Sequence, residues 1–199
     1  GTGTLQIANN NTFGGNIYIS NGVVNVGTGG TSGALSGTNV IFVPSGSTLI
    51  NERGDHYTAN VAFNHSLQGS GTWIARGSGV SLYSDFDITG SQTGFTGTLI
   101  IDRARFRADS VNDAGFATIN VVTGGQFWAF GANNVFTNAI TIAGQGWQEG
   151  ALYGAIRLQN SGVNYAGPVI LANGSRIGAV TTENWVTNTI SGGYDLEAY

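Results

Sequence analysis

The sequence predicts an all-β protein whose short strands stack into a parallel solenoid. Apolar and polar residues alternate in short runs, such as Leu5-Gln6-Ile7 and Val24-Asn25-Val26, a period of two that marks strands with one buried side. Segments rich in Asn and Gly separate these runs and suit the corners between strands. Related motifs return along the whole chain, which is typical of repeat architectures.

The opening segment, residues 1–27, contains three of these runs in succession. Strands this short cannot bury a sheet core of their own. Each is therefore expected to form hydrogen bonds with its counterparts one coil above and one coil below. The residues expected to point inward are Leu5, Ile7, Ile17, Ile19, Val24 and Val26.

The same segment carries a Gly-x-Gly-Thr-Leu-x-Ile start, an Asn-Thr-aromatic turn and an apolar-x-apolar-Gly ending. It resembles the autotransporter-associated β-strand repeat, also called the passenger-associated transport repeat. Asn16 stands where members of that family often have a second Gly. The resemblance is strong over residues 1–27, fair over about the first half of the chain and weaker beyond. The matching residues are Gly1, Gly3, Thr4, Leu5, Ile7, Asn11, Thr12, Phe13, Gly15, Ile19, Gly22, Val24, Val26 and Gly27.

The resemblance implies a right-handed parallel β-helix in the passenger part of a bacterial surface or secreted protein. It implies neither an enzyme activity nor a ligand. The chain has no Met, no signal peptide and no apolar run of membrane-spanning length, so we expect a mature or excised part of a larger precursor. The expected location is extracellular or on the bacterial outer-membrane surface, with no membrane insertion by this segment.

Residues 1–199 are expected to form a single solenoid domain of about ten coils, on the order of 50 Å long at an inter-strand rise of ~4.8 Å. Residues 94–109 align with residues 12–27 without a gap. This alignment predicts that Leu99, Ile101, Phe106 and Ala108 point inward, and that Arg105 and Arg107 lie on the outer face. The Ile17-Tyr18-Ile19 strand is expected to recur at Val61-Ala62-Phe63, Leu99-Ile100-Ile101, Ile140-Thr141-Ile142 and Val169-Ile170-Leu171.

The composition excludes several classes of partner and cofactor. Charged residues make up 9% of the chain and the formal net charge is −4, whereas proteins that bind nucleic acid cluster Lys and Arg against the phosphates. There is no Cys, so a disulfide framework and a Cys-based zinc site are both excluded. No cofactor is expected.

The triplet Arg53-Gly54-Asp55 spells a motif of integrin-binding proteins and lies in a polar corner, residues 51–60. An exposed turn would suit an adhesive role. Repeats of the resembled family carry a similar corner, however, and a corner Asp that accepts backbone hydrogen bonds explains the residues without a receptor. The structural interpretation is favoured, and the adhesive one is the alternative.

Glu52, Asp55, His56 and His65 could be assembled into a metal site, but their spacing fits no known ligand motif. Solvated surface histidines are the favoured interpretation. No metal is expected.

Residues 102–109 contain the densest group of charges and the best enzyme candidate, with Arg103, Arg105 and Arg107 between two Asp residues. Polysaccharide lyases on β-helices use an Arg with calcium-binding carboxylates, which would have to converge from several stacked strands. The alternating spacing instead favours an outward row of Arg paired with neighbouring Asp.

Trp147 and Tyr153 lie in a Gly-rich excursion, residues 144–155, and are candidates for a sugar-stacking surface. Packing in the core is the favoured interpretation of the aromatic residues as a whole.

The sequence thus predicts a non-enzymatic structural stalk or adhesin with no catalytic residue. Its expected partner is itself, through end-to-end or lateral stacking into fibres, or a host or matrix glycan or protein. A β-helical polysaccharide-degrading enzyme and a carbohydrate-binding module are the alternatives.

Overall fold

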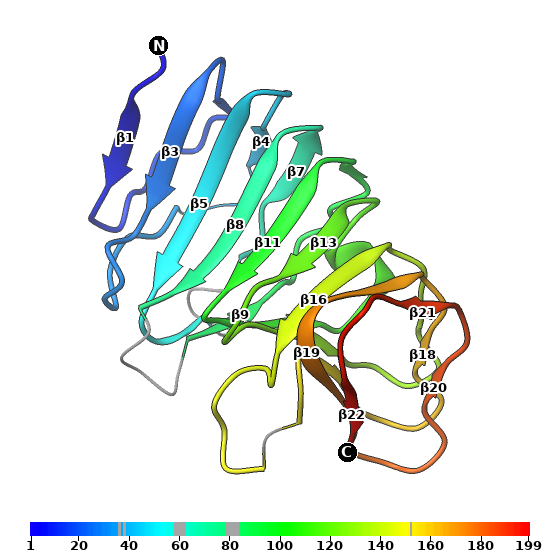
Figure 1. Cartoon of the computed structure of the whole chain (residues 1–199). Helices are drawn as coiled ribbons and strands as arrows, with labels where there is room; N and C mark the ends of the chain where they lie inside the picture. Colours follow the sequence, from blue (N-terminus) through cyan, green and yellow to red (C-terminus); the bar gives the residue numbers. More distant parts are fainter. Residues whose placement is uncertain (36, 38, 58–62, 79–83, 152) are drawn as a thin grey trace.

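The computed structural model is an all-β solenoid of about seven turns, in which parallel strands stack coil upon coil (Figure 1). It describes residues 1–35, 37, 39–57, 63–78, 84–151 and 153–199. Every pairing between named strands is parallel and joins a strand to its counterparts in neighbouring coils, as β3 joins β1 to β5. The predicted fold class is confirmed.

Three walls surround the core. The first wall contains β1 (Thr4–Ile7), β3 (Gly22–Val26), β5 (Ser47–Arg53), β8 (Thr72–Gly77), β11 (Thr98–Asp102), β13 (Thr118–Val121), β16 (Ile140–Gly144), the first part of β19 (Val169–Ala179) and β21 (Ile190–Ser191). The second wall contains β6 (His56–Tyr57), β9 (Asp85–Asp87), β12 (Arg105–Ala108), β14 (Gln126–Ala129), β17 (Ile156–Leu158), the last part of β19 and β22 (Leu196–Ala198). Because β19 belongs to both, these walls form one 15-stranded sheet.

The third wall consists of two short sheets and completes the coils. The first sheet contains β2 (Ile17–Tyr18), β4 (Val40–Phe42), β7 (Ser66–Gly69) and β10 (Gly94–Phe95), and the second contains β15 (Val135–Phe136), β18 (Asn164–Tyr165) and β20 (Trp185–Val186). A 3-10 turn, η1 (Val111–Asp113), follows β12.

The core is a set of side-chain columns that run along the solenoid. The first wall contributes Leu5, Val24, Leu49, Trp73, Leu99, Ile119, Ile140, Val169 and Ile190 in Cα register. The second wall contributes a facing column, and the Trp73 and Phe106 rings meet across the core with centroids 5.3 Å apart. The predicted inward residues Leu99, Ile101, Phe106 and Ala108 are all fully buried, which confirms the alternation there.

The proposed recurrence of the Ile17 strand is wrong in one respect. Ile17 pairs with Ile41 in the third wall, whereas Leu99 and Ile140 lie in the first wall. Apolar triplets from different walls look alike in the sequence, because all of them point alternate residues at the same core. Residues 61 and 62, part of the same expectation, lie outside the described residues.

Several coils are longer than ten equal coils in this chain would be, which explains why there are about seven turns rather than the expected ten. Leu5 and its partner Val24 are 19 residues apart, whereas Ile140 and its partner Val169 are 29 apart. The longer coil holds the Gly-rich excursion between β16 and β17. Such excursions lengthen a corner without adding a strand to the stack.

His65, expected at the surface, is fully buried. Its Nε2 lies 3.2 Å from the Leu35 carbonyl oxygen, and its ring meets Phe63 edge-on. Burial lowers the pKa of His65, because the charged imidazolium is disfavoured away from water.

Candidate functional site

The densest group of charged side chains lies on the outer surface of the second wall. On β12 the apolar Phe106 and Ala108 are buried in the core, so Arg105 and Arg107 lie on the outer side of the strand, as predicted. Strand register extends these two positions into outer rows that run from coil to coil. One row contains Asp85, Arg105 and Gln126, and the other contains Asp87, Arg107, Trp128 and Arg157.

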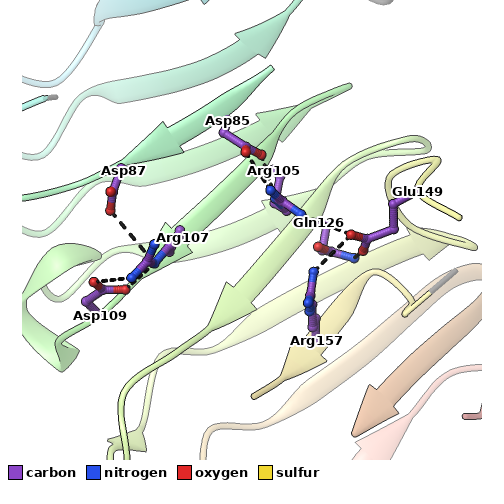
Figure 2. Close-up of polar contacts among 8 residues, drawn as sticks. All are labelled: Asp85, Asp87, Arg105, Arg107, Asp109, Gln126, Glu149 and Arg157. Atoms are coloured by element: carbon purple, nitrogen blue, oxygen red, sulfur yellow. Dashed lines mark hydrogen bonds and ion pairs between the residues drawn. The ribbon is translucent and has the colours of Figure 1, made fainter. Parts of the chain in front are cut away.

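Arg105 is the centre of the group (Figure 2). Its Nε and Nη2 donate to the two carboxylate oxygens of Asp85, on the neighbouring strand. Its Nη1 donates to Glu149 Oε2 at 3.0 Å. The guanidinium carbon also lies 4.4 Å from the ring centre of Trp128 and 4.8 Å from that of Trp147, which are cation–π distances.

Glu149 comes from the excursion between β16 and β17, which we call the strap: residues 145–151 together with Tyr153. Its Oε2 accepts from Arg105 and from Arg157 Nη1, the latter at 2.9 Å, and its Oε1 accepts from Gln126 Nε2 at 2.9 Å. Gly178 on β19 lets the strap approach the sheet, because a Cβ there would lie 2.1 Å from the Tyr153 carbonyl oxygen.

The aromatic candidates cover guanidinium groups. Trp147 is 8% exposed and packs against Arg105. The ring centre of the half-buried Tyr153 lies 4.2 Å from the guanidinium carbon of Arg157, and the ring meets that of Tyr199 edge-on. Trp147 therefore does not present the open ring that the sugar-stacking alternative requires, because its face is covered by Arg105, and its burial agrees with the favoured packing interpretation, although it packs on the outer side of the second wall.

The other two predicted arginines are paired with their own neighbours. Arg107 Nη2 donates to Asp109 at 2.8 Å, and Arg107 lies 3.9 Å from Asp87. Arg103 is half-exposed at the turn before β12 and donates to Asp102 at 3.0 Å. The hydrogen bond and charge of Asp102 raise the pKa of Arg103. Arg103 does not join the cluster around Arg105.

Arg157 is the most deeply buried arginine of the cluster. Its side chain is 9% exposed, and its guanidinium carbon lies 4.3 Å from the ring centre of Trp128. Burial lowers the pKa of Arg157, and the Glu149 carboxylate opposes that shift.

Arg53-Gly54-Asp55 does not form the exposed turn that an adhesive motif requires. Arg53 is 1% exposed, donates to Asp55 through two nitrogens at 2.8 and 2.7 Å, and donates to the Gly33 carbonyl at 3.1 Å. A Cβ on Gly54 would lie 2.2 Å from the Gly29 carbonyl oxygen. The burial of Arg53 argues against the adhesive alternative and agrees with the favoured structural interpretation, in which the Asp55 carboxylate is paired inside the same corner, here with the Arg53 guanidinium.

No family model, no curated protein and no solved structure matches this chain. Across the part of the chain that the structure describes, no three or more His, Asp or Glu residues are grouped as a metal site would require. Within the same residues, no helix has the length and apolar character to cross a membrane.

One further carboxyl group has unusual electrostatics. Asp113 is buried, accepts a hydrogen bond from the Ser110 backbone N–H at 2.8 Å and closes the capping box of η1. Burial raises the pKa of Asp113 to about 7, and the nearby carboxylates of Asp109 and Asp87 add to the shift. It is a proton-holding group near neutral pH in a structural position.

Sequence analysis missed Glu149, Arg157, Gln126 and Asp85 as parts of this site. Arg105 and Glu149 are 44 residues apart, and only the stacking of coils brings them together. A usable signal was the single acidic residue in the Gly-rich excursion, since an isolated charge in such a segment calls for a partner.

Proposed function

We propose that this chain is a non-enzymatic structural segment, a rigid stalk or adhesin part of a bacterial surface protein of the passenger type. The observation that supports this proposal best is the state of the arginines that sequence analysis singled out. Arg103, Arg105 and Arg107 all bind carboxylates of the chain itself. Groups used in this way hold neighbouring strands and loops together.

The architecture supports a role in which stiffness and length matter. Each coil is hydrogen-bonded to the next through in-register parallel strands, and apolar columns continue from coil to coil. Bending such a rod would require ladders on one side to open. The surface location rests on the resemblance of residues 1–27 to passenger repeats.

Self-association is a variant of the same proposal. Leu5 and Ile190 terminate the first-wall column and are 60% and 37% exposed. A second copy that stacked on either end would cover them. We expect concentration-dependent multimers in light scattering coupled to size exclusion, which Leu5→Lys should weaken. A monomer at every concentration would remove this variant and leave the stalk proposal standing.

The proposal is tested by a depolymerisation screen of the purified chain against neutral and acidic polysaccharides. We expect no new reducing ends and no new unsaturated products. Turnover that is lost in Arg105→Gln, with the far-UV circular dichroism of the wild type retained, would identify an enzyme instead. Arg103→Gln is the matched control, because Arg103 lies outside the cluster.

A further inference from the structure

The second wall neutralises most of its own arginines, but its strands offer no carboxylate beside Arg157 in the outer row. Arg105 and Arg107 each face an Asp at the paired position of β9. Arg157 has Trp128 and Gly178 as its neighbours in the outer row. Among the described residues its carboxylate partner is Glu149 of the strap, at 2.9 Å. The sheet therefore presents a surplus guanidinium, and a loop supplies the anion.

The groups around Glu149 form a receptor for a carboxylate. Arg105, Gln126 and Arg157 come from three adjacent strands, β12, β14 and β17, and we call them the cradle (Figure 2). Their nitrogens reach the two oxygens of one carboxylate at 2.9–3.0 Å. Charge-assisted hydrogen bonds from converging, rigidly held donors give both strength and selectivity for a planar anion.

The cradle has hydrogen-bonding capacity that Glu149 does not use. Trp128 Nε1, Arg157 Nε and Gln126 Oε1 are buried and have no hydrogen-bond partner among the described residues. Their side chains belong to residues that are 8%, 7% and 0% exposed. Buried unpaired groups are unfavourable. Two spare donors and one spare acceptor would be satisfied by a ligand that carries hydroxyl groups beside its carboxylate.

We propose that the cradle is a binding site for uronate residues of an acidic polysaccharide, with Glu149 as an internal substitute for the sugar carboxylate. The ring hydroxyls of a uronate supply both acceptors for Trp128 and Arg157 and a donor for Gln126. Glu149 leaves when the strap lifts away from the sheet, and the ligand carboxylate takes over its three hydrogen bonds. The inference does not depend on the proposed stalk function.

An internal competitor has a measurable consequence. A tethered carboxylate acts at an effective concentration on the order of millimolar, so it weakens the binding of any free carboxylate to the same donors. Removing it should therefore reveal the site. Glu149→Ala is expected to bind galacturonate oligomers at least ~10-fold more tightly than the wild type.

The experiment uses the full chain, with binding followed by tryptophan fluorescence and by calorimetry. Neutral galactose oligomers of the same length should not bind. Glycolate tests whether a small hydroxy acid suffices, and we expect it to bind at least ~10-fold more weakly than the oligomer because it reaches fewer of the spare groups. Equal binding of neutral and acidic oligomers would overturn the proposal, as would equal binding of glycolate.

Variants locate the site. In the Glu149→Ala background, Arg157→Gln should abolish uronate binding, whereas Arg176→Gln should not change it. Arg176 is the matched control, because it lies on the same wall and pairs with the exposed Glu197. Glu149→Gln keeps the size of the side chain and should also bind more tightly than the wild type. Binding that survives Arg157→Gln would place the ligand elsewhere and refute the assignment.

A measurement on the wild type keeps the test independent of variant stability. Saturating galacturonate oligomer should increase amide hydrogen exchange in residues 145–151, because the strap is displaced. Binding without increased exchange there would contradict displacement of Glu149. Binding without depolymerisation would leave the stalk proposal intact, and absence of binding would remove only the uronate site.

Discussion

The first and second walls share one core but differ in the composition of their outer surfaces. On the first wall, Thr4, Thr48, Thr72, Thr98 and Thr118 occupy one outer row, and Ile50, Ile74 and Ile100 occupy the next. These two rows are uncharged, and each named side chain has its own kind in an adjacent coil or two coils away. A third outer row of the same wall is charged, and its Arg76 and Asp102 form an ion pair at 2.8 Å between adjacent strands. On the second wall both outer rows contain arginines and carboxylates, and their partners come from other strands and also from a loop.

This difference shows that a solenoid constrains its inward and its outward positions differently. Inward positions must be apolar on every wall, because they meet at the same core. Outward positions are free to differ, and two kinds of stabilisation result. The outer rows of the first wall depend on contacts between neighbouring coils, whereas the cluster of the second wall also depends on Glu149, 44 residues from Arg105.

The largest loss of stability is expected for an inward side chain that packs against both walls. Trp73 is fully buried, donates to Asn51 Oδ1 at 2.8 Å and packs against Phe106 of the second wall. Trp73→Ala should lower the free energy of unfolding by about 4 kcal/mol, through the cavity that it leaves. Urea unfolding followed by circular dichroism measures this. Ile74→Ala, on the outer side of the same strand, is the control and should cost less than half as much.

The second prediction concerns the cluster alone. Glu149→Gln removes the carboxylate charge that pairs with Arg157 and with Arg105. The nearly buried guanidinium of Arg157 then has no carboxylate partner at this position, and that of Arg105 keeps only Asp85. We expect a loss of about 3 kcal/mol in unfolding free energy. The same change at Glu197, whose ion pair with Arg176 is solvent-exposed on the acid side, should cost less than about 1 kcal/mol. Equal losses would mean that the strap contributes no more than a surface ion pair.

The third prediction uses pH. Asp113 has a pKa of about 7 in the folded chain and an ordinary value of 3.8 when exposed. Between these values the folded state holds a proton that the unfolded state has released, so the contribution of Asp113 to stability falls as pH rises from about 4 to about 7. Each unit of raised pKa corresponds to about 1.4 kcal/mol.

Asp113→Asn should remove this dependence while keeping an acceptor for the Ser110 N–H. The measurement is the difference in unfolding free energy between the variant and the wild type at pH 4.5 and pH 7.5. We expect the variant to gain relative to the wild type as pH increases. A constant difference across this range would show that Asp113 stays ionised in the fold.

The smallest effect is expected on the outer surface of the first wall. Thr72 lies between Thr48 and Thr98 in its row and is half-buried. Thr72→Ala should cost about 0.5 kcal/mol, within the range of single cross-strand contacts. Thermal unfolding resolves this if Thr72→Ser, which keeps the hydroxyl, is measured alongside. A loss as large as that of Glu149→Gln would refute the contrast between the two walls.

The fold could be predicted from the sequence because alternation is a local property. The period of two alone predicts that Phe106 and Ala108 point inward and that Arg105 and Arg107 point outward. The wall to which a strand belongs depends on contacts between distant parts of the chain. For that reason the sequence pattern groups Ile17 with strands of the first wall, whereas Ile17 pairs with Ile41 in the third.

The site was harder to predict, because its parts meet only through stacking. The paired charges near Arg105 were expected in general terms, but Asp85 and Glu149 lie on another strand and on the strap. Arg53 illustrates the same difficulty within one short motif. The triplet Arg53-Gly54-Asp55 matches a receptor-binding motif in sequence. In the fold, the Arg53 side chain is held inside by a hydrogen bond to the Gly33 carbonyl of a different coil, which the triplet alone does not reveal.

Strand β19 passes from the first wall into the second without a break, and both β21 and β22 pair with it. A tensile load on the C-terminal coil is therefore shared by two ladders that must rupture together. At the opposite end β1 is held by β3 through a single ladder. A load that pulls on β1 should therefore open its ladder at a lower force than a load that pulls on the C-terminal coil.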